Sequence, residues 1–214
     1  MTNEIYQPTT TRKWYEIWWD VWSHPGMPPF QALLTEPNHS AQRGYIWIAV
    51  TSLIVVLLTG ISSTLSIPDI RSQVAYFFIY FVCGVILSPF FAILGVIISA
   101  GIYHGIARLL GGTGKWSDLV ICQCAITAPS ELIAGLVSMI AFLFAIARQN
   151  FIFLSIFSFL LGIYGIVLNV NALKTSENIN TGRAILTVFI PVIFVGLVVL
   201  CAIIALIPVT RASG

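Results

Sequence analysis

The chain has 214 residues, and only 8% of them are charged, whereas about 25% is usual for a soluble globular domain. Hydrophobic residues make up 58% of the chain and its mean hydropathy is +0.95, as in proteins whose side chains mostly face lipid. These values exclude a water-soluble fold and predict an all-α, polytopic membrane helix bundle. The net charge of +2 leaves no basic surface large enough for nucleic acid, so no nucleic-acid partner is expected.

The N-terminal segment, residues 1–44, is rich in tryptophan. Trp14, Trp18 and Trp22 are spaced by four residues, which places them on one side of a helix, and Trp19 lies beside them. Because the tryptophan ring favours the headgroup layer, we expect an amphipathic interfacial helix over about 13–24, anchored at the membrane surface by these four rings. Packing of the rings against the helix bundle is the alternative.

Apolar stretches long enough to cross a hydrocarbon core of about 30 Å follow this segment. We expect a cytoplasmic N-terminal segment, then a transmembrane domain of five helices over 45–208, then a C-terminal tail over 209–214. The five spans are predicted at about 45–66, 83–108, 119–147, 151–172 and 184–208.

The number of spans depends on the uncharged stretch 74–107, which as one straight helix would measure about 51 Å. It can form a hairpin broken at Ser88 and Pro89, or one long helix whose first part, 74–88, is tilted, re-entrant or interfacial. For the next span, residues 117–127 can likewise be re-entrant, interfacial or part of a long tilted helix.

The distribution of Lys and Arg favours the long helix. With five spans, seven of the ten basic residues lie on the N-terminal side of the membrane, whereas six spans divide them five to five. Because short cytoplasmic loops accumulate Lys and Arg, we expect five spans with the N-terminus in the cytoplasm and the C-terminus outside.

Small residues and cysteines predict packing rather than chemistry. Gly101 and Gly105 have the G-x-x-x-G spacing that lets two membrane helices approach closely, so they predict a packing face. Cys122 and Cys124 form a C-x-C pair, but a structural zinc site needs four ligands and no further Cys or His lies nearby in the sequence. We expect no metal, no cofactor and no catalytic residue.

Polar residues within the spans form a candidate intramembrane cluster of His104, Arg108 and Glu131. His104 lies one turn before Arg108, and Glu131 is the acid inside a predicted span, where it would cost at least about 2.5 kcal/mol at mid-membrane. If the span begins near Ala128, Glu131 falls in its first turn, close to His104 in depth. Three roles stay open for Glu131: a structural one at the helix start, a cluster with His104 or Arg108, and a proton or ion path.

The segment from Gly101 to Leu132 carries a pattern of seven residues: His104, Gly111, Gly112, Gly114, Trp116, Ala128 and Pro129. A helix that ends near a histidine, a Gly-Gly-x-Gly turn, an aromatic residue and an Ala/Pro-containing span resemble the Yip1 domain family. The Trp-rich lead-in and the short N-terminal region resemble its prokaryotic branch. The resemblance implies a non-catalytic integral membrane protein that organises or assists others, and we expect it in a prokaryotic plasma membrane.

The resemblance does not extend to binding of Rab-type GTPases. Eukaryotic members associate with these GTPases through a region that bears an Asp-Leu-Tyr-Gly-Pro motif, which this chain lacks. The expected function is that of an adaptor, organiser or accessory subunit, in contact with the lipid bilayer and with other membrane proteins or a second copy of itself. The alternative is a small transporter or channel, formed by an oligomer around Glu131 and His104. An enzyme is not expected, because H-E-x-x-H and G-x-S-x-G motifs are absent.

Overall fold

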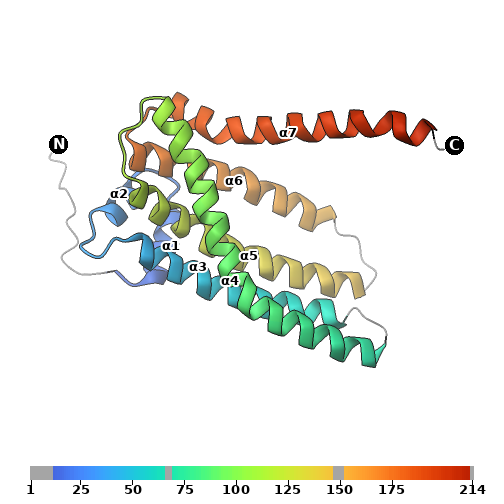
Figure 1. Cartoon of the computed structure of the whole chain (residues 1–214). Helices are drawn as coiled ribbons and strands as arrows, with labels where there is room; N and C mark the ends of the chain where they lie inside the picture. The colour runs from blue at the N-terminus through green and yellow to red at the C-terminus, as the bar shows by residue number, and fades with distance from the viewer. Residues whose placement is uncertain (1–11, 66–68, 147–151, 213–214) are drawn as a thin grey trace.

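A computed structural model of the chain describes residues 12–65, 69–146 and 152–212. These residues form helices and no strand (Figure 1), which confirms the all-α prediction. The helices are α1 (Trp14–Ser23), α2 (Pro28–Leu34), α3 (Ala41–Leu65), α4 (Ile70–Leu109), α5 (Trp116–Ile146), α6 (Ile152–Glu177) and α7 (Thr181–Ala212).

Four helices of the described residues contain segments that are long and apolar enough to cross a membrane. These segments are Ala41–Ile61, Arg71–Leu109, Trp116–Phe142 and Ile152–Glu177. In α7 the apolar segment found among the described residues is Thr181–Phe194, which is shorter than the other four. The protein is therefore a multi-pass integral membrane protein in contact with the bilayer, and four of its described helices, rather than the five expected, are candidate spans.

Helix α3 lies at the centre of the bundle and packs most extensively on α5 and α4. Helix α3 can approach α5 closely because Gly44 has no side chain. A Cβ atom at this position would lie 2.8 Å from both Cβ and Sγ of Cys124. Ser88 Oγ donates a hydrogen bond to Ser52 O at 3.2 Å and so joins α4 to α3. Close backbone approach and hydrogen bonds between helices are the usual means of helix association in lipid.

Helix α4 runs without interruption from Ile70 to Leu109, with Pro89 inside it. The chain therefore forms the long helix rather than the hairpin, and it begins earlier than the predicted residue 83. Asp69 caps the N-terminus by accepting a hydrogen bond from Ser72 N at 2.8 Å. The same backbone bond holds the pKa of the Asp69 carboxyl below its ordinary value.

Helix α5 is also continuous, from Trp116 to Ile146, with Pro129 inside it. This corrects the placement of Glu131 in the first turn of a span, since the helix begins 15 residues earlier. Pro129 has no N–H to donate to Ala125 O, and the next carbonyl along the helix, Ile126 O, accepts a hydrogen bond from Ser130 Oγ at 2.6 Å.

Burial is concentrated at the end of the bundle where α3 and α5 begin and α4 and α6 end. Helices α1 and α2 cover this end, as Figure 1 shows, and α7 leaves it beside α6. Residues 119–126 of α5 are buried there, together with Leu168, Leu173 and Glu177 near the end of α6. We call the assembly of α1, α2 and the α2–α3 loop (residues 35–40) the N-terminal cap, and the polar contacts described below lie in or under it.

Candidate functional site

Helix α1 attaches the N-terminal cap to the bundle through one face. Ile17, Trp18 and Val21 are buried, and the Trp18 ring packs edge-on against Trp47 of α3 with ring centroids 6.1 Å apart. The other face is open, since Trp14 is 52% exposed and Trp19 is 75% exposed.

The predicted tryptophan stripe is therefore divided between two environments. Trp22 contacts Tyr164 of α6 with ring centroids 5.4 Å apart, and the Tyr164 hydroxyl donates to Trp22 O. Trp18 and Trp22 thus make the contacts with the bundle that the alternative interpretation described, whereas Trp14 and Trp19 do not. Trp14 lies on the same side of the helix as Ile17, Trp18 and Val21 but is its first residue, whereas Trp19 lies on the opposite side.

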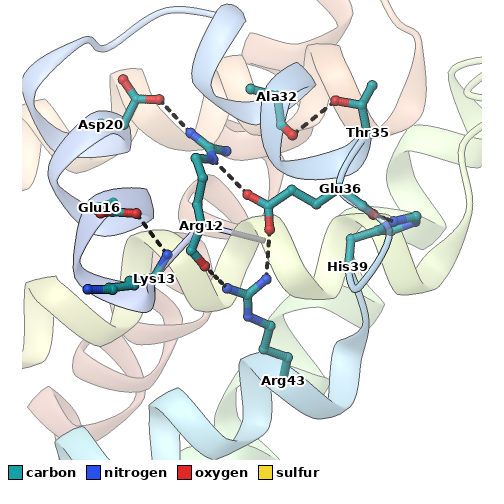
Figure 2. A network of polar contacts seen from close by, with 9 residues as sticks. All are labelled: Arg12, Lys13, Glu16, Asp20, Ala32, Thr35, Glu36, His39 and Arg43. Carbon is teal, nitrogen blue, oxygen red and sulfur yellow. Dashed lines mark hydrogen bonds and ion pairs between the residues drawn. The ribbon is translucent and has the colours of Figure 1, made fainter. Parts of the chain in front are cut away.

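A buried carboxylate lies at the centre of the N-terminal cap (Figure 2). The Glu36 side chain is fully buried and accepts hydrogen bonds from Arg12 Nε and from Arg43 Nη1, each at 2.7 Å. Arg12 Nη1 also reaches Asp20 Oδ2 of α1 at 2.9 Å, and Arg43 Nη2 donates to Arg12 O at 2.6 Å. The Arg43 guanidinium lies 5.2 Å from the ring centroid of Trp47.

This network joins the segment before α1, α1 itself, the α2–α3 loop and the first turn of α3. A buried carboxylate is costly unless cations and hydrogen bonds compensate it, and two guanidinium groups do so here. The sequence analysis missed the network, because no spacing rule links Arg12 to Glu36, 24 residues away.

A second buried carboxylate joins the C-terminal ends of α4 and α6. His104 Nδ1 donates to Glu177 Oε1 at 2.6 Å, and the Glu177 side chain is fully buried. Arg108 Nη2 donates to Gly114 O at 2.7 Å, and its Nε lies 3.5 Å from His104 Nε2. Glu177 Oε2 is buried and has no hydrogen-bond partner within the described residues.

The glycine turn between α4 and α5, residues 110–115, is shaped by its contact with the end of α6. Gly111 has a φ of +88°, a left-handed conformation that strains residues with a side chain. A Cβ atom at Gly114 would lie 1.8 Å from Ser176 O, so only glycine allows the turn to contact the end of α6. Thr113 N donates to Glu177 O at 3.0 Å and closes the contact. The Gly-Gly-x-Gly pattern thus has a structural cause.

The candidate intramembrane cluster is only partly assembled. His104 and Arg108 lie together as expected, but Glu131 instead accepts a hydrogen bond from Thr51 Oγ1 of α3 at 3.2 Å. Because α5 begins at Trp116, Glu131 lies well along the helix, and Glu177 takes the place beside His104. Glu177 is the last acidic residue of the chain, but nothing in the sequence indicates which helix end it meets.

Among the described residues, the predicted glycine packing face meets a neighbouring helix at one of its two glycines. A Cβ atom at Gly101 would lie 3.5 Å from the Trp116 ring, and one at Gly105 would meet no atom within 4 Å. Cys122 and Cys124 are buried in α5 as free thiols. Across the described ranges, no three His, Cys, Asp or Glu side chains are grouped so that they could hold a metal ion.

The fold and these contacts define a multi-pass helical membrane protein with a covered end and a tight glycine turn beneath it. The family model described as the Yip1 domain matches residues 19–203, most of the chain, so the chain belongs to the Yip1 domain family. The match includes His104 and the glycine turn, and it confirms the resemblance seen in the sequence. No curated protein and no solved structure matches the chain.

The buried ion pairs predict that substitution of Glu36 strongly lowers the stability of the protein. In Glu36→Gln the two arginines lose the charge that compensates them, and we expect the free energy of unfolding to fall by about 3 kcal/mol, the lower end for broken buried pairs because both arginines are partly exposed. The matched control is Glu16→Gln, whose exposed carboxylate bonds only the backbone of Lys13 and should cost less than about 1 kcal/mol. Unfolding in mild detergent would measure both, and equal losses would contradict the role of Glu36.

The glycine turn gives a second test. Gly114→Ala forces a methyl group into a backbone oxygen, so we expect a loss of at least about 3 kcal/mol or failure to assemble. Gly105→Ala, in open space within α4, should be neutral or stabilise by up to about 1 kcal/mol. Thermal unfolding of the purified variants would compare them, and a tolerated Gly114→Ala would show that the turn can move away from α6.

Proposed function

We propose that the protein is a non-catalytic adaptor or accessory subunit that organises or assists other membrane proteins. The observation that carries this proposal is the N-terminal cap, which is fixed to the bundle on one side and presents aromatic side chains on the other. Trp18, Val21 and the Glu36 network hold it in place, while Trp14 and Trp19 stay exposed. A rigid, non-reactive surface of this kind suits docking rather than chemistry.

The exposed face of α1 suits the membrane surface. Tyr15 and Trp19 lie on the open side of the helix, Trp14 is exposed at its first turn, and Lys13 Nζ lies 5.7 Å from the ring centroid of Tyr15. Aromatic rings and a lysine are typical of the headgroup layer, where rings are half-buried and charges stay wet. We propose that these residues anchor the cap at the surface and so set its orientation toward partner proteins.

The proposed topology has five spans, with α7 as the fifth, in a prokaryotic plasma membrane. Arg43, Arg108, Lys115, Lys174 and Arg183 all lie near the capped end of the bundle, at helix ends or in the connecting turns. Their common location supports a cytoplasmic cap, because positive residues accumulate on that side.

The transporter alternative receives less support. It requires Glu131 and His104 in one polar cluster, but each has its own partner on a different helix, Thr51 and Glu177. Polar residues that line an ion path face a common cavity.

The topology is tested with single cysteines in a chain whose native cysteines are replaced. Cysteines at Lys115 and Asn178, both exposed at the capped end, should be protected from an impermeant thiol reagent in intact cells. Cysteines at Asp69, and at Ser213 outside the described residues, should label. Protection at Ser213 would remove α7 as a span, and labelling at Lys115 would invert the topology.

The adaptor role is tested by chemical cross-linking in native membranes, followed by affinity purification of the full chain and quantitative mass spectrometry. We expect a stoichiometric partner whose recovery falls about tenfold in the double variant Trp14→Ala, Trp19→Ala. The control Phe78→Ala, Phe159→Ala removes equally exposed rings from the membrane-spanning surface and should leave recovery unchanged. A chain that purifies alone and conducts ions in liposomes would support the transporter instead.

A further inference from the structure

Glu131 lies in the seam between α3 and α5, the most extensive helix contact of the bundle. Close approaches of the two helices lie on either side of it. Gly44 lies against Cys124, and a Cβ atom at Gly135 would lie 3.2 Å from Cγ2 of Val55. Glu131 is the central residue of α5, 15 residues from each end, which is about 22 Å along the helix. Its carboxyl group is therefore near the middle of the hydrocarbon layer.

Among the described residues, no cation is placed to compensate an ionised Glu131. The apolar parts of α3, α4 and α6 contain no Lys, Arg or His over residues 44–65, 72–103 and 152–173, and α5 contains none over 117–146. The other titratable groups within these stretches are cysteine thiols and tyrosine phenols, which supply no positive charge. An ionised carboxylate in hydrocarbon is unfavourable unless a cation pairs with it.

The charged groups of the neighbouring helices are gathered at the capped end, where α5 begins. Together with the charges of the N-terminal cap, they are Arg43, His104, Arg108, Asp118, Lys174 and Glu177. Several of them already have partners there, as Arg43 has in Glu36 and Glu177 has in His104. The carboxyl group at the centre of α5 is therefore left without a counter-charge.

The Thr51 hydroxyl beside Glu131 has more acceptors than protons. Thr51 Oγ1 lies 3.0 Å from Trp47 O, 3.1 Å from Ile48 O and 3.2 Å from Glu131 Oε2. A hydroxyl donates one hydrogen bond and accepts up to two. Thr51 is fully buried and its two nearest acceptors are carbonyls of its own helix, so its proton is used there. The contact with Glu131 then needs a proton from the carboxyl group.

A similar arrangement occurs two turns further along α3, with a phenol in place of the carboxyl group. Thr59 Oγ1 lies 2.7 Å from Val55 O of its own helix and 2.9 Å from the Tyr80 hydroxyl of α4. When Thr59 donates to Val55 O, the phenol donates to Thr59, and each proton is used once. Ser52 and Thr64 also donate to carbonyls within one turn of α3. Donation to the helix itself is thus common to these hydroxyls of α3.

We infer that Glu131 is a proton-binding site at mid-membrane. Its carboxyl group carries a proton at neutral pH and donates it in a hydrogen bond to Thr51 Oγ1. The group is then neutral, as its surroundings require, and the bond joins α5 to α3. Because the Glu131 side chain is only half-buried, the site is also open to carboxyl reagents that dissolve in the bilayer. It is remote from the N-terminal cap and does not depend on the proposed adaptor role.

Reaction with a lipid-soluble carbodiimide tests for the proton. The full chain in liposomes at neutral pH is treated with dicyclohexylcarbodiimide, which reacts with carboxylic acids rather than carboxylates. The carboxyl oxygen bonds to the carbodiimide carbon, the proton moves to nitrogen, and rearrangement gives a stable N-acylurea with nothing released. We expect an adduct that mass spectrometry locates at Glu131. The adduct should be absent from Glu131→Gln, whose amide can still donate to Thr51, and absence of labelling at Glu131 in the native chain would overturn the inference.

A change of salt separates a proton from a metal cation as the occupant. Labelling of Glu131 should be the same in sodium chloride and in choline chloride, because a proton site does not need a metal ion. Loss of labelling in sodium chloride would show that a metal cation binds the carboxylate, and it would overturn the inference. Glu16→Gln is the matched control, since its carboxylate is exposed and should not contribute to the adduct at Glu131.

Infrared spectra give a test in which no reagent has to reach the site. At neutral pH the full chain should show the carbonyl band of a carboxylic acid, lost in Glu131→Gln and kept in Glu16→Gln. Thr51→Val removes the acceptor, so the band should remain but move to higher wavenumber. A native spectrum without the band, or a band that Thr51→Val does not move, would contradict the inference. Partner recovery through the cap does not enter either measurement, so the two proposals fail separately.

Discussion

The covered end of the molecule depends on the pairing of the Glu36 carboxylate with Arg12 and Arg43. Because Glu36 is buried, its charge must be neutralised within the protein, and Arg12 and Arg43 reach it from opposite ends of the cap. Their positions fix where the chain enters α1 and where α3 begins. The orientation of α1, and with it the choice of which tryptophans face outward, follows from this constraint and from the Trp18 contact with Trp47.

A second buried carboxylate, that of Glu177, is compensated by a hydrogen bond from His104 beneath the N-terminal cap. It ties α4 to α6, which share few contacts elsewhere, at the point where both helices leave the apolar layer. The glycine turn can approach α6 because Gly114 has no side chain, and its Thr113 N–H then satisfies the last carbonyl of the helix, at Glu177. The hydrogen bond between His104 and Glu177 and the close backbone approach at Gly114 thus act together where α4 and α6 meet.

The hydropathy of the sequence predicted the features that a lipid bilayer requires, namely long apolar helices. Apolar length and charge distribution were sufficient to indicate helices, four of the spans and the continuity of α4 through Pro89. They could not predict which polar groups meet, because Glu177 and His104 are 73 residues apart and a pairing between helix ends has no period. The division of the Trp14, Trp18 and Trp22 stripe was hidden for a related reason, since a helical wheel shows that residues share a side but not where the neighbouring helix lies.

The length of α4 has a consequence for the membrane around the protein. Its uncharged stretch, residues 74–107, measures about 51 Å, well above the usual hydrocarbon thickness of about 30 Å, and a tilt of about 40° still leaves roughly 39 Å. The first half of the helix exposes aromatic side chains, among them Phe77, Phe78 and Phe81, that cannot stay in water. Lipid must therefore thicken locally or bend to cover them. The protein imposes a hydrophobic mismatch on its surroundings, and this deformation would favour bilayers that are thick or already curved.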